Sequence, residues 1–340
     1  MQQTSGTTAA VRALGANGGS STDAVDTTET LERKCVVCQS TEEVRVFSAN
    51  CERLCVPCFV ERFERSFRYA VQRWSMLSHG ERVAVALSGG PASLALLELL
   101  HGLRRGFAHH KGKIRPKHFE IVVFHVIVPA GYGGNGASGA AALQALVQER
   151  YGLTVHTVDE ALFLARADAL EMSTRDPMAT NHQLDVLDPT IAPALVAGIV
   201  NALLERMAEA YECKKLFLGT TVTRAAIITI ARVATGNPLR LDAEIGVDYH
   251  SSTAGCQGSA YASSGPLRWL RPLRNISLRD VIRYLRARGC TAWITPAEPW
   301  AQENIESTAE RFIWRALETR PATSFSVVHS IERALNLSAD

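Results

Sequence analysis

The sequence predicts an α/β protein in which a doubly wound, mainly parallel sheet follows a small N-terminal zinc ribbon. Three observations support this class. Short apolar strands alternate with amphipathic helices between residues 83 and 288, a glycine turn at 88–90 joins the first strand to a helix, and two C-x2-C pairs precede both. Strands that alternate with helices form parallel sheets, and ligands bind at the carboxyl ends of such strands.

The chain has 340 residues, 46% of them apolar, so it can bury a substantial core. We divide it into a disordered tail (1–33), a zinc ribbon (34–62), a pyrophosphate-loop-like α/β domain (63–320) and a C-terminal helix (321–340). The tail lacks the basic start and apolar block of a signal peptide, and no run of about 18 uncharged apolar residues occurs in the sequence. We therefore expect a cytoplasmic protein without membrane contact.

Five of the eight cysteines lie close together near the N-terminus. Cys35 and Cys38 form one pair, Cys55 and Cys58 form another, and Cys51 lies between the pairs. Two C-x2-C pairs separated by sixteen residues are typical of one structural Zn²⁺ site, and the metal would let so short a ribbon fold. A redox dithiol and an iron–sulfur cluster are the competing interpretations, and they require a reactive thiolate or a delivered cluster.

An amphipathic helix is predicted directly after the ribbon, because aromatic and apolar residues recur at i, i+4 spacing from Phe59 to Val71. The other faces of this helix carry Arg62, Arg65, Arg68 and Arg73. These arginines are available for contacts with phosphate groups.

Continuous apolar runs predict the strands of the sheet at 83–87, 119–128, 153–158 and 215–219. An edge segment follows near residue 268 and leads into the last helix of the sheet, whose predicted buried stripe is Leu278, Val281, Ile282 and Leu285. A threonine is the candidate N-cap of the helix after the fourth strand. The carboxyl ends of the first and fourth strands are expected to face the same cleft.

The turn between the first strand and its helix has the composition of a phosphate site. Glycines let backbone amides approach an anion, and the helix N-terminus adds a partial positive charge. We interpret Ser88, Gly89, Gly90 and Ser93 as a phosphate or nucleotide loop. The turn is neither a Walker A loop nor a Rossmann fingerprint, and a plain tight turn is the alternative.

Two segments are strongly basic although the formal net charge is only +2. Residues 60–117 contain eleven Lys or Arg against four Asp or Glu, and residues 266–288 contain seven Arg against one Asp. This distribution favours contact with nucleic acid. A solvated helix face is the alternative for either segment alone.

Seven motifs resemble, in order, those of the cytoplasmic tRNA 2-thiolation protein 2 family: CVVC, CVPCF, SFR, ALSGGPAS, LTVHTVDEALF, KKLFLGTTVTRAAI and WLRPLRNISLRDV. The resemblance covers about residues 34–320. SGGPAS itself is similar to the pyrophosphate-loop signature Ser-Gly-Gly-x-Asp-Ser of ATP-dependent adenylating enzymes. The fold that this resemblance implies is the adenine-nucleotide alpha hydrolase-like type.

The resemblance implies a subunit of the cytosolic complex that thiolates C2 of the wobble uridine (mcm5s2U) in tRNAs for Lys, Glu and Gln. The implied partners are tRNA, a catalytic paralogue (cytoplasmic tRNA 2-thiolation protein 1) in a heterodimer, and a thiocarboxylated ubiquitin-related modifier as sulfur donor. In active relatives ATP adenylates the uridine oxygen with the help of Mg²⁺, and a sulfur nucleophile then displaces AMP.

The chain departs from the active pattern where carboxylates are needed to hold Mg²⁺. Ala92 replaces the loop Asp, and Thr223 and Arg224 stand where active relatives have Gly-His-Asn followed by two Asp. These changes argue against use of ATP and Mg²⁺ and predict a noncatalytic subunit. The residues that we expect to bind tRNA are Arg62, Arg65, Arg68, Arg224, Arg283 and Arg286.

Two other functions stay open from the sequence. One is an ATP-dependent tRNA adenylating sulfurtransferase whose missing carboxylate comes from Asp159, Asp242, Glu244 or Asp248. The other is a zinc-stabilised scaffold that binds only protein. Cys51 could replace one of the four ligands or simply pack, Cys213 and Cys290 are expected to be packed thiols, and Cys256 is an isolated thiol to which the pattern assigns no role.

Overall fold

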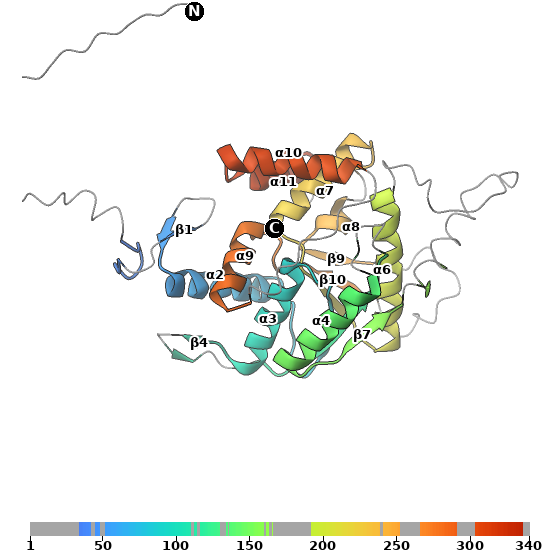
Figure 1. Cartoon of the computed structure of the whole chain (residues 1–340), viewed down its shortest axis with the longest axis horizontal. Helices are drawn as coiled ribbons and strands as arrows, with labels where there is room; N and C mark the ends of the chain where they lie inside the picture. Colours follow the sequence, from blue (N-terminus) through green and yellow to red (C-terminus); the bar gives the residue numbers. More distant parts are fainter. Residues whose placement is uncertain are drawn as a thin grey trace, which may run out of the picture.

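The computed structural model describes most of the chain beyond the N-terminal tail (Figure 1). The described residues are 34–41, 45–47, 52–109, 112–113, 116–129, 134, 136–159, 161–162, 165, 192–238, 241–251, 266–290 and 303–335. The expected disordered tail (1–33), Cys51 and Cys256 lie outside these residues.

A six-stranded sheet with the order β7-β6-β3-β8-β10-β9 forms the centre of the fold. Its strands are β3 (Arg82–Ala86), β6 (Glu120–Val126), β7 (Val155–Val158), β8 (Lys215–Leu218), β9 (Asp248–His250) and β10 (Arg268–Leu270). β9 pairs antiparallel with β10, and the other neighbours pair in parallel. The predicted mainly parallel sheet is confirmed. The expectation that the segment near residue 268 forms an edge was wrong, because β9 covers that side of β10.

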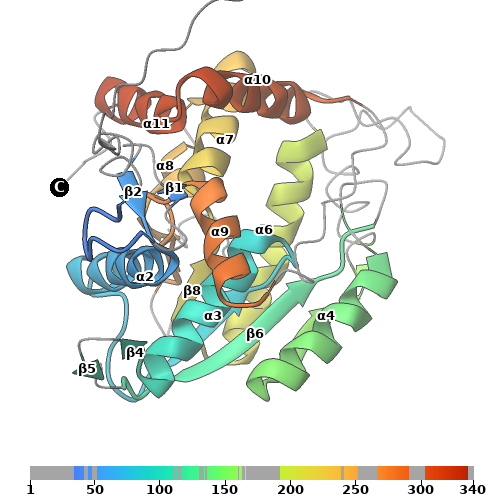
Figure 2. The same ribbon diagram turned by 60° about the vertical axis from the view of Figure 1, so that its left-hand side comes forward.

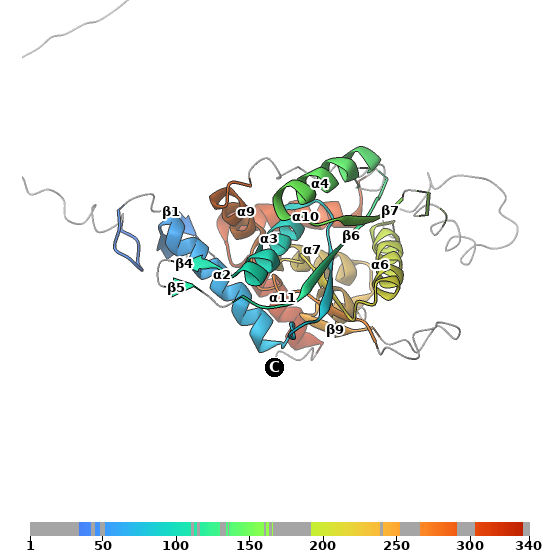
Figure 3. The same cartoon turned by 90° about the horizontal axis from the view of Figure 1, so that it is seen from below.

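Helices cover both faces of the sheet, as the doubly wound class requires. The helices on one face are α2 (Val56–Arg73), α3 (Pro91–Arg105), α4 (Gly136–Tyr151) and α9 (Leu278–Ala287). Val83 and Val85 of β3 share a hydrophobic core with these helices, whereas Ala84 packs with α6 (Ala192–Ala210) on the other face. Successive residues of a strand point to opposite faces. Figure 3 shows α4 and α6 on opposite sides of β6 and β7.

Four more helices pack together beside the carboxyl ends of the strands (Figures 1 and 2). They are α7 (Val222–Ala234), α8 (Leu241–Ile245), α10 (Ile305–Thr319) and α11 (Thr323–Ala334). α11 occupies the segment where we expected a C-terminal helix, and it packs against α7 through Val328. Among the described helices, none combines the length and the apolar character that crossing a membrane requires.

The N-terminal ribbon contains the antiparallel hairpin of β1 (Arg45–Phe47) and β2 (Glu52–Leu54). A second small pair, β4 (Ala108–His109) and β5 (Gly112–Lys113), follows α3. Residue 62, where we placed the end of the ribbon, lies inside α2, so the ribbon continues directly into a helix of the main core.

The predicted stripe of α2 is buried in this core, from Phe59 at 5% exposure to Phe67 at 0%. In α9 the fully buried residues are Val281, Tyr284 and Leu285, and Leu278 is only partly buried. Tyr284 was not in the predicted stripe, whereas Ile282, which was, is only partly buried. The Tyr284 ring stacks on Phe63 of α2 with the centroids 4.4 Å apart, so α2 and α9 are held together by an aromatic pair.

Candidate functional site

The glycine turn after β3 brings the N-terminus of α3 to the carboxyl edge of the sheet. Gly89 has a φ of 82°, a conformation that favours glycine, and Gly90 is the N-cap of α3. Among the described residues no side chain caps this helix, and no acidic residue lies in its first turn, so its first amides face the turn. The Ser93 hydroxyl donates to the Gly90 carbonyl at 2.9 Å, and the Ser88 hydroxyl donates to Ser93 at 3.2 Å. The turn therefore has the backbone of an anion site with its hydroxyls bonded internally.

The end of β8 lies directly against this turn. A Cβ atom added at Gly219 would be 2.6 Å from the Ser93 nitrogen and 2.7 Å from the Ala92 carbonyl carbon, which is too close for any side chain. β3 and β8 are parallel neighbours, so their carboxyl ends share one edge of the sheet. The first and fourth strand ends therefore lie side by side, while the expectation that they face one cleft stays a prediction.

Thr223 and Arg224, which stand where the resemblance implies acidic groups in active relatives, are engaged in structural contacts. The predicted threonine N-cap of α7 is Thr221, which accepts from the Arg224 amide at 3.3 Å. The Thr223 hydroxyl accepts from the Leu278 amide at the start of α9 at 3.1 Å. The Arg224 guanidinium donates to the buried Glu306 carboxylate of α10 at 2.6 Å. Thr223 and Arg224 thus tie α7 to α9 and α10, and neither side chain offers a carboxylate to Mg²⁺.

Three of the four carboxylates considered as substitutes are bonded to other groups, and the fourth lines a separate cleft. Asp248 begins β9, three strands from β3, which corresponds to about 14 Å at the usual strand spacing, and it forms an ion pair with Arg268. Glu244 forms an ion pair with Arg232 at 2.8 Å. Asp159 follows β7, the edge strand opposite to β9, and accepts a hydrogen bond from the Leu162 amide at 2.9 Å. Asp242 is exposed and lines a cleft beside α2.

A buried histidine beside the turn was missed from the sequence. His125 of β6 is 9% exposed, and its Nδ1 lies 2.6 Å from the carbonyl oxygen of Leu87, the residue before Ser88. Burial lowers the pKa of His125, so the ring is neutral at pH 7 and Nδ1 is the donor in this contact. A single polar residue within an apolar strand was the signal that could have identified it.

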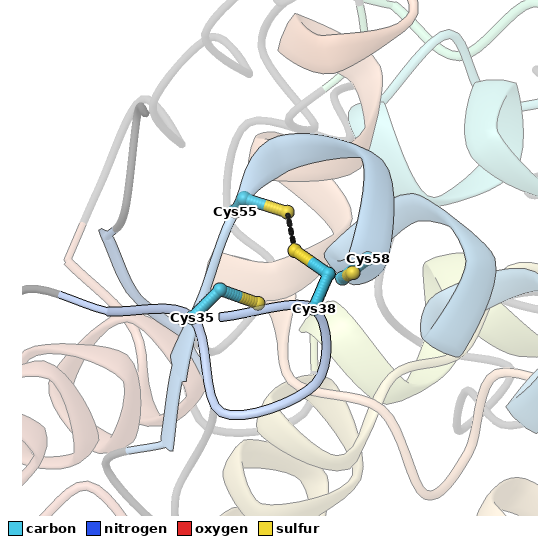
Figure 4. Close-up of side chains that lie close together, drawn as sticks. All are labelled: Cys35, Cys38, Cys55 and Cys58. Atoms are coloured by element: carbon cyan, nitrogen blue, oxygen red, sulfur yellow. Dashed lines mark hydrogen bonds between the residues drawn. The ribbon is translucent and has the colours of Figure 1, made fainter. Parts of the chain in front are cut away.

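The four cysteines of the two C-x2-C pairs converge on one point (Figure 4). Cys35 and Cys38 lie in a tight turn whose Val36 amide donates to Arg53 of β2 at 3.0 Å. Cys55 is the N-cap of α2 and Cys58 lies in its first turn. All four sulfur atoms lie within 4.8 Å of one another, and the Cys38 and Cys55 sulfurs are 3.5 Å apart.

This four-cysteine cluster fits a single metal ion. Zn–S bonds of about 2.3 Å in a tetrahedron place the sulfurs about 3.8 Å apart. Burial would raise the pKa of Cys35, but hydrogen bonds from the backbone of Cys38 and Cys55 outweigh it and lower that pKa to about 6. One thiolate is therefore present at neutral pH to begin metal binding. In the described part of the chain, no other group of three or more metal-ligating side chains occurs.

The remaining described cysteines are separate packed thiols. Cys213 is 5% exposed and Cys290 is 0% exposed. Burial raises the pKa of each thiol to about 11, so both are protonated at neutral pH. Neither has the character of a sulfur carrier.

The six arginines expected to bind tRNA do not form one continuous surface. Arg62 and Arg65 line the cleft beside α2, whereas Arg68 lies about 60° further around the helix from Arg65, and its Nε is buried with no hydrogen-bond partner among the described residues. Arg224 is paired with Glu306, Arg283 is paired with Asp280 at 3.3 Å, and Arg286 is exposed. Part of the second basic segment is internal, because Arg271 and Arg274 are each 3% exposed.

The fold and the glycine turn define the class: an α/β protein of the pyrophosphate-loop type with a four-cysteine cluster at its N-terminus. U34-tRNA thiolase NcsA from Methanococcus maripaludis, solved with its [4Fe-4S] cluster, shares this fold with a TM-score of 0.62 and 18% identity over 89% of this chain and 87% of that one. No family model matches the sequence.

Curated relatives give the particular resemblance. Cytoplasmic tRNA 2-thiolation protein 2 of Sclerotinia sclerotiorum is 24% identical over 74% of this chain and 68% of its own length. The proteins of the same name from Drosophila persimilis and Drosophila pseudoobscura are 22% and 23% identical over 80% of this chain. The resemblance indicated by the seven motifs is thereby confirmed. The chain spans about two thirds of the length of these relatives.

Proposed function

We propose that this chain acts in the 2-thiolation of the wobble uridine of tRNA, as a tRNA-binding subunit that does not itself catalyse the reaction. The names of the curated relatives and the fold shared with a U34-tRNA thiolase support the thiolation role. The expected substrates are the tRNAs for Lys, Glu and Gln.

The noncatalytic role is supported by one observation: the turn keeps its anion-binding backbone while the acidic positions carry Ala92, Thr223 and Arg224. Adenylation of uridine transfers AMP from ATP to the C2 oxygen with release of pyrophosphate, and sulfur then displaces AMP. The developing charge on the phosphates requires Mg²⁺ held by carboxylates. Arg224 offers no carboxylate and is ion-paired with Glu306 of α10, so in this proposal the adenylation chemistry belongs to a partner.

The partners follow from the same proposal. The catalytic paralogue, cytoplasmic tRNA 2-thiolation protein 1, would form a heterodimer with this chain in the cytoplasm and supply the adenylation site. The ubiquitin-related modifier, as a thiocarboxylate, would deliver the sulfur to the complex. In this scheme the four-cysteine cluster binds a structural Zn²⁺ that fixes the ribbon to the start of α2, where the sulfur geometry suits one tetrahedral ion.

Phosphate contacts position an RNA and contribute much of its affinity, while base recognition resides in the partner. We expect Arg62, Arg65, Arg68, Arg224, Arg283 and Arg286 to make such contacts. Arg286 is exposed, and Arg65 and Arg224 keep 66% and 48% of their side chains exposed although each lies near a carboxylate.

The experiment measures 2-thiouridine at the wobble position of tRNA from cells that lack the gene. Loss of the thio group, with restoration by the wild-type gene, is the expected result. An Ala92→Asp variant that restores the loop carboxylate should complement no better than the wild-type gene. Normal thiolation in the deletion strain would contradict the proposal.

A further inference from the structure

A cleft of about 990 Å³ runs along the outer side of α2 and is not explained by the glycine turn or the four-cysteine cluster. α2 forms one wall from Cys58 to Trp74, about 24 Å of helix at 1.5 Å per residue. The facing wall comes from α8, the segment before β9, residues 271–276 and α11. Figure 2 shows α2, α8 and α11 on the same side of the molecule.

The α2 wall combines cations with an aromatic ring. Arg62, Arg65, Tyr69 and Arg73 fall within about 80° around the helix axis, and Arg68 lies about 60° beyond Arg65, outside the cleft lining. Tyr69 is 62% exposed, which is unusual for so large a ring on a helix that buries its other aromatic residues. Arginines that alternate with an exposed aromatic ring along a groove are typical of surfaces that bind single-stranded nucleic acid.

The facing wall contributes a buried positive charge without a carboxylate partner. Arg271 is 3% exposed and donates to the carbonyl oxygens of Gly246 and Ala243 at 2.9 and 2.6 Å. Its Nε has no acceptor, and no ion pair of Arg271 is found within the described residues. Burial lowers the pKa of Arg271 to about 10, so it remains charged at pH 7. Glu244 and Asp242 lie near enough to oppose this shift, but neither forms an ion pair with Arg271 within the described residues, so the guanidinium can still attract an anion in the adjoining cleft.

Most acidic groups that line the cleft are already neutralised. Of the carboxylates that line the cleft, Asp248 pairs with Arg268, Glu332 pairs with Arg274, and Glu61 pairs with Arg65 at 3.5 Å. Asp242 is exposed at the start of α8. The arginines that line the cleft outnumber its carboxylates, so the cleft keeps a positive charge.

We propose that this cleft binds a single-stranded segment of RNA, with phosphates held by Arg62, Arg65 and Arg73 and a base stacked on Tyr69. The inference rests on the proposed function, which makes RNA the class of ligand. It adds a defined site on one side of α2, separate from the arginines of α9. The cleft adjoins the four-cysteine cluster through Val37 and Cys58, so the metal would fix the end of α2 that forms its mouth.

The test uses the full-length chain, purified without chelator, and a fluorescein-labelled uridine-rich octanucleotide followed by fluorescence anisotropy. Tyr69→Ala should weaken binding about 5- to 150-fold because stacking is lost, and Tyr69→Phe should retain it. Arg73→Gln should reduce the slope of log affinity against log salt by about 0.7. Arg105→Gln removes an exposed charge at the end of α3, outside the cleft, and should change neither quantity.

Equal affinities of Tyr69→Ala and the wild-type chain for the octanucleotide would overturn the inference. Loss of binding to a polyglutamate peptide in Tyr69→Ala, with RNA binding unchanged, would also overturn it and assign the cleft to an acidic protein. If Arg286→Gln weakens tRNA binding while Tyr69→Ala does not, the proposed function stands, but the proposal that the cleft binds RNA is wrong. If neither the chain nor its complex with the paralogue binds tRNA, the proposed function fails with it.

Discussion

The buried carboxylate of Glu64 on α2 should make the stability of the protein depend on pH. Glu64 is 2% exposed and accepts a hydrogen bond from the Tyr284 hydroxyl at 3.2 Å. Burial raises the pKa of this carboxyl from 4.5 to about 7, and the charge of Arg288 offsets only part of the effect. A carboxyl with a raised pKa destabilises the folded state progressively between pH 4.5 and 7, and fully above pH 7.

The magnitude follows from the two pKa values. At 1.36 kcal/mol per pKa unit, the difference between 4.5 and about 7 corresponds to at most about 3 kcal/mol. Glu64→Gln keeps an oxygen for the Tyr284 hydroxyl and removes the charge. We therefore expect this variant to raise the free energy of unfolding by up to about 3 kcal/mol at pH 8.5 and by less than about 1 kcal/mol at pH 5.

Urea unfolding followed by circular dichroism at pH 5 and pH 8.5 provides the assay. Glu98 of α3 is the matched control, since it is also buried but accepts from Arg150 at 3.2 Å and from Tyr151 at 2.8 Å. Burial alone would raise the pKa of Glu98, but these contacts outweigh it and lower the pKa. Glu98→Gln should lower the free energy of unfolding by about 3–5 kcal/mol at both pH values, because it breaks a buried ion pair. A Glu64→Gln variant less stable than the wild type at pH 8.5 would refute the reasoning.

Three other perturbations test the candidate site. The purified chain should contain about one equivalent of zinc, and a chelator should unfold the ribbon; less than half an equivalent would contradict a zinc site. Gly219→Ala should destabilise the protein by about 1–3 kcal/mol, because its Cβ would meet the Ser93 nitrogen at 2.6 Å, and an unchanged melting temperature would contradict that contact. Arg224→Gln should cost about 1–3 kcal/mol in chemical unfolding, because it leaves the buried Glu306 with a weaker pair; no loss would show that the pair contributes nothing.

The parallel strands and the glycine turn were predictable because their sequence signals are local. Continuous apolar runs mark β3, β6 and β8, which are buried on both faces by helices. The convergence of the four cysteines was predictable because two C-x2-C pairs have few ways to satisfy one ion.

Contacts between distant segments could not be predicted. β9 is three residues long and polar, so it has no apolar pattern that would mark it as the strand covering β10. Composition showed that residues 266–288 are basic, but not that Arg271 donates to backbone carbonyls or that Arg274 pairs with Glu332 of α11. Each partner lies on an element whose approach is set by packing of the whole core. The cleft along α2 was hidden for the same reason.

In this account the glycine turn keeps its anion-binding backbone but lacks the carboxylates that adenylation requires. Incubation of the full-length chain with tRNA, Mg²⁺ and ATP labelled at the α-phosphate tests this claim most directly, with the catalytic paralogue as positive control. Labelled AMP should appear on tRNA only when the paralogue is present. Label on tRNA with this chain alone, lost when Gly89 is replaced by Val, would contradict the claim.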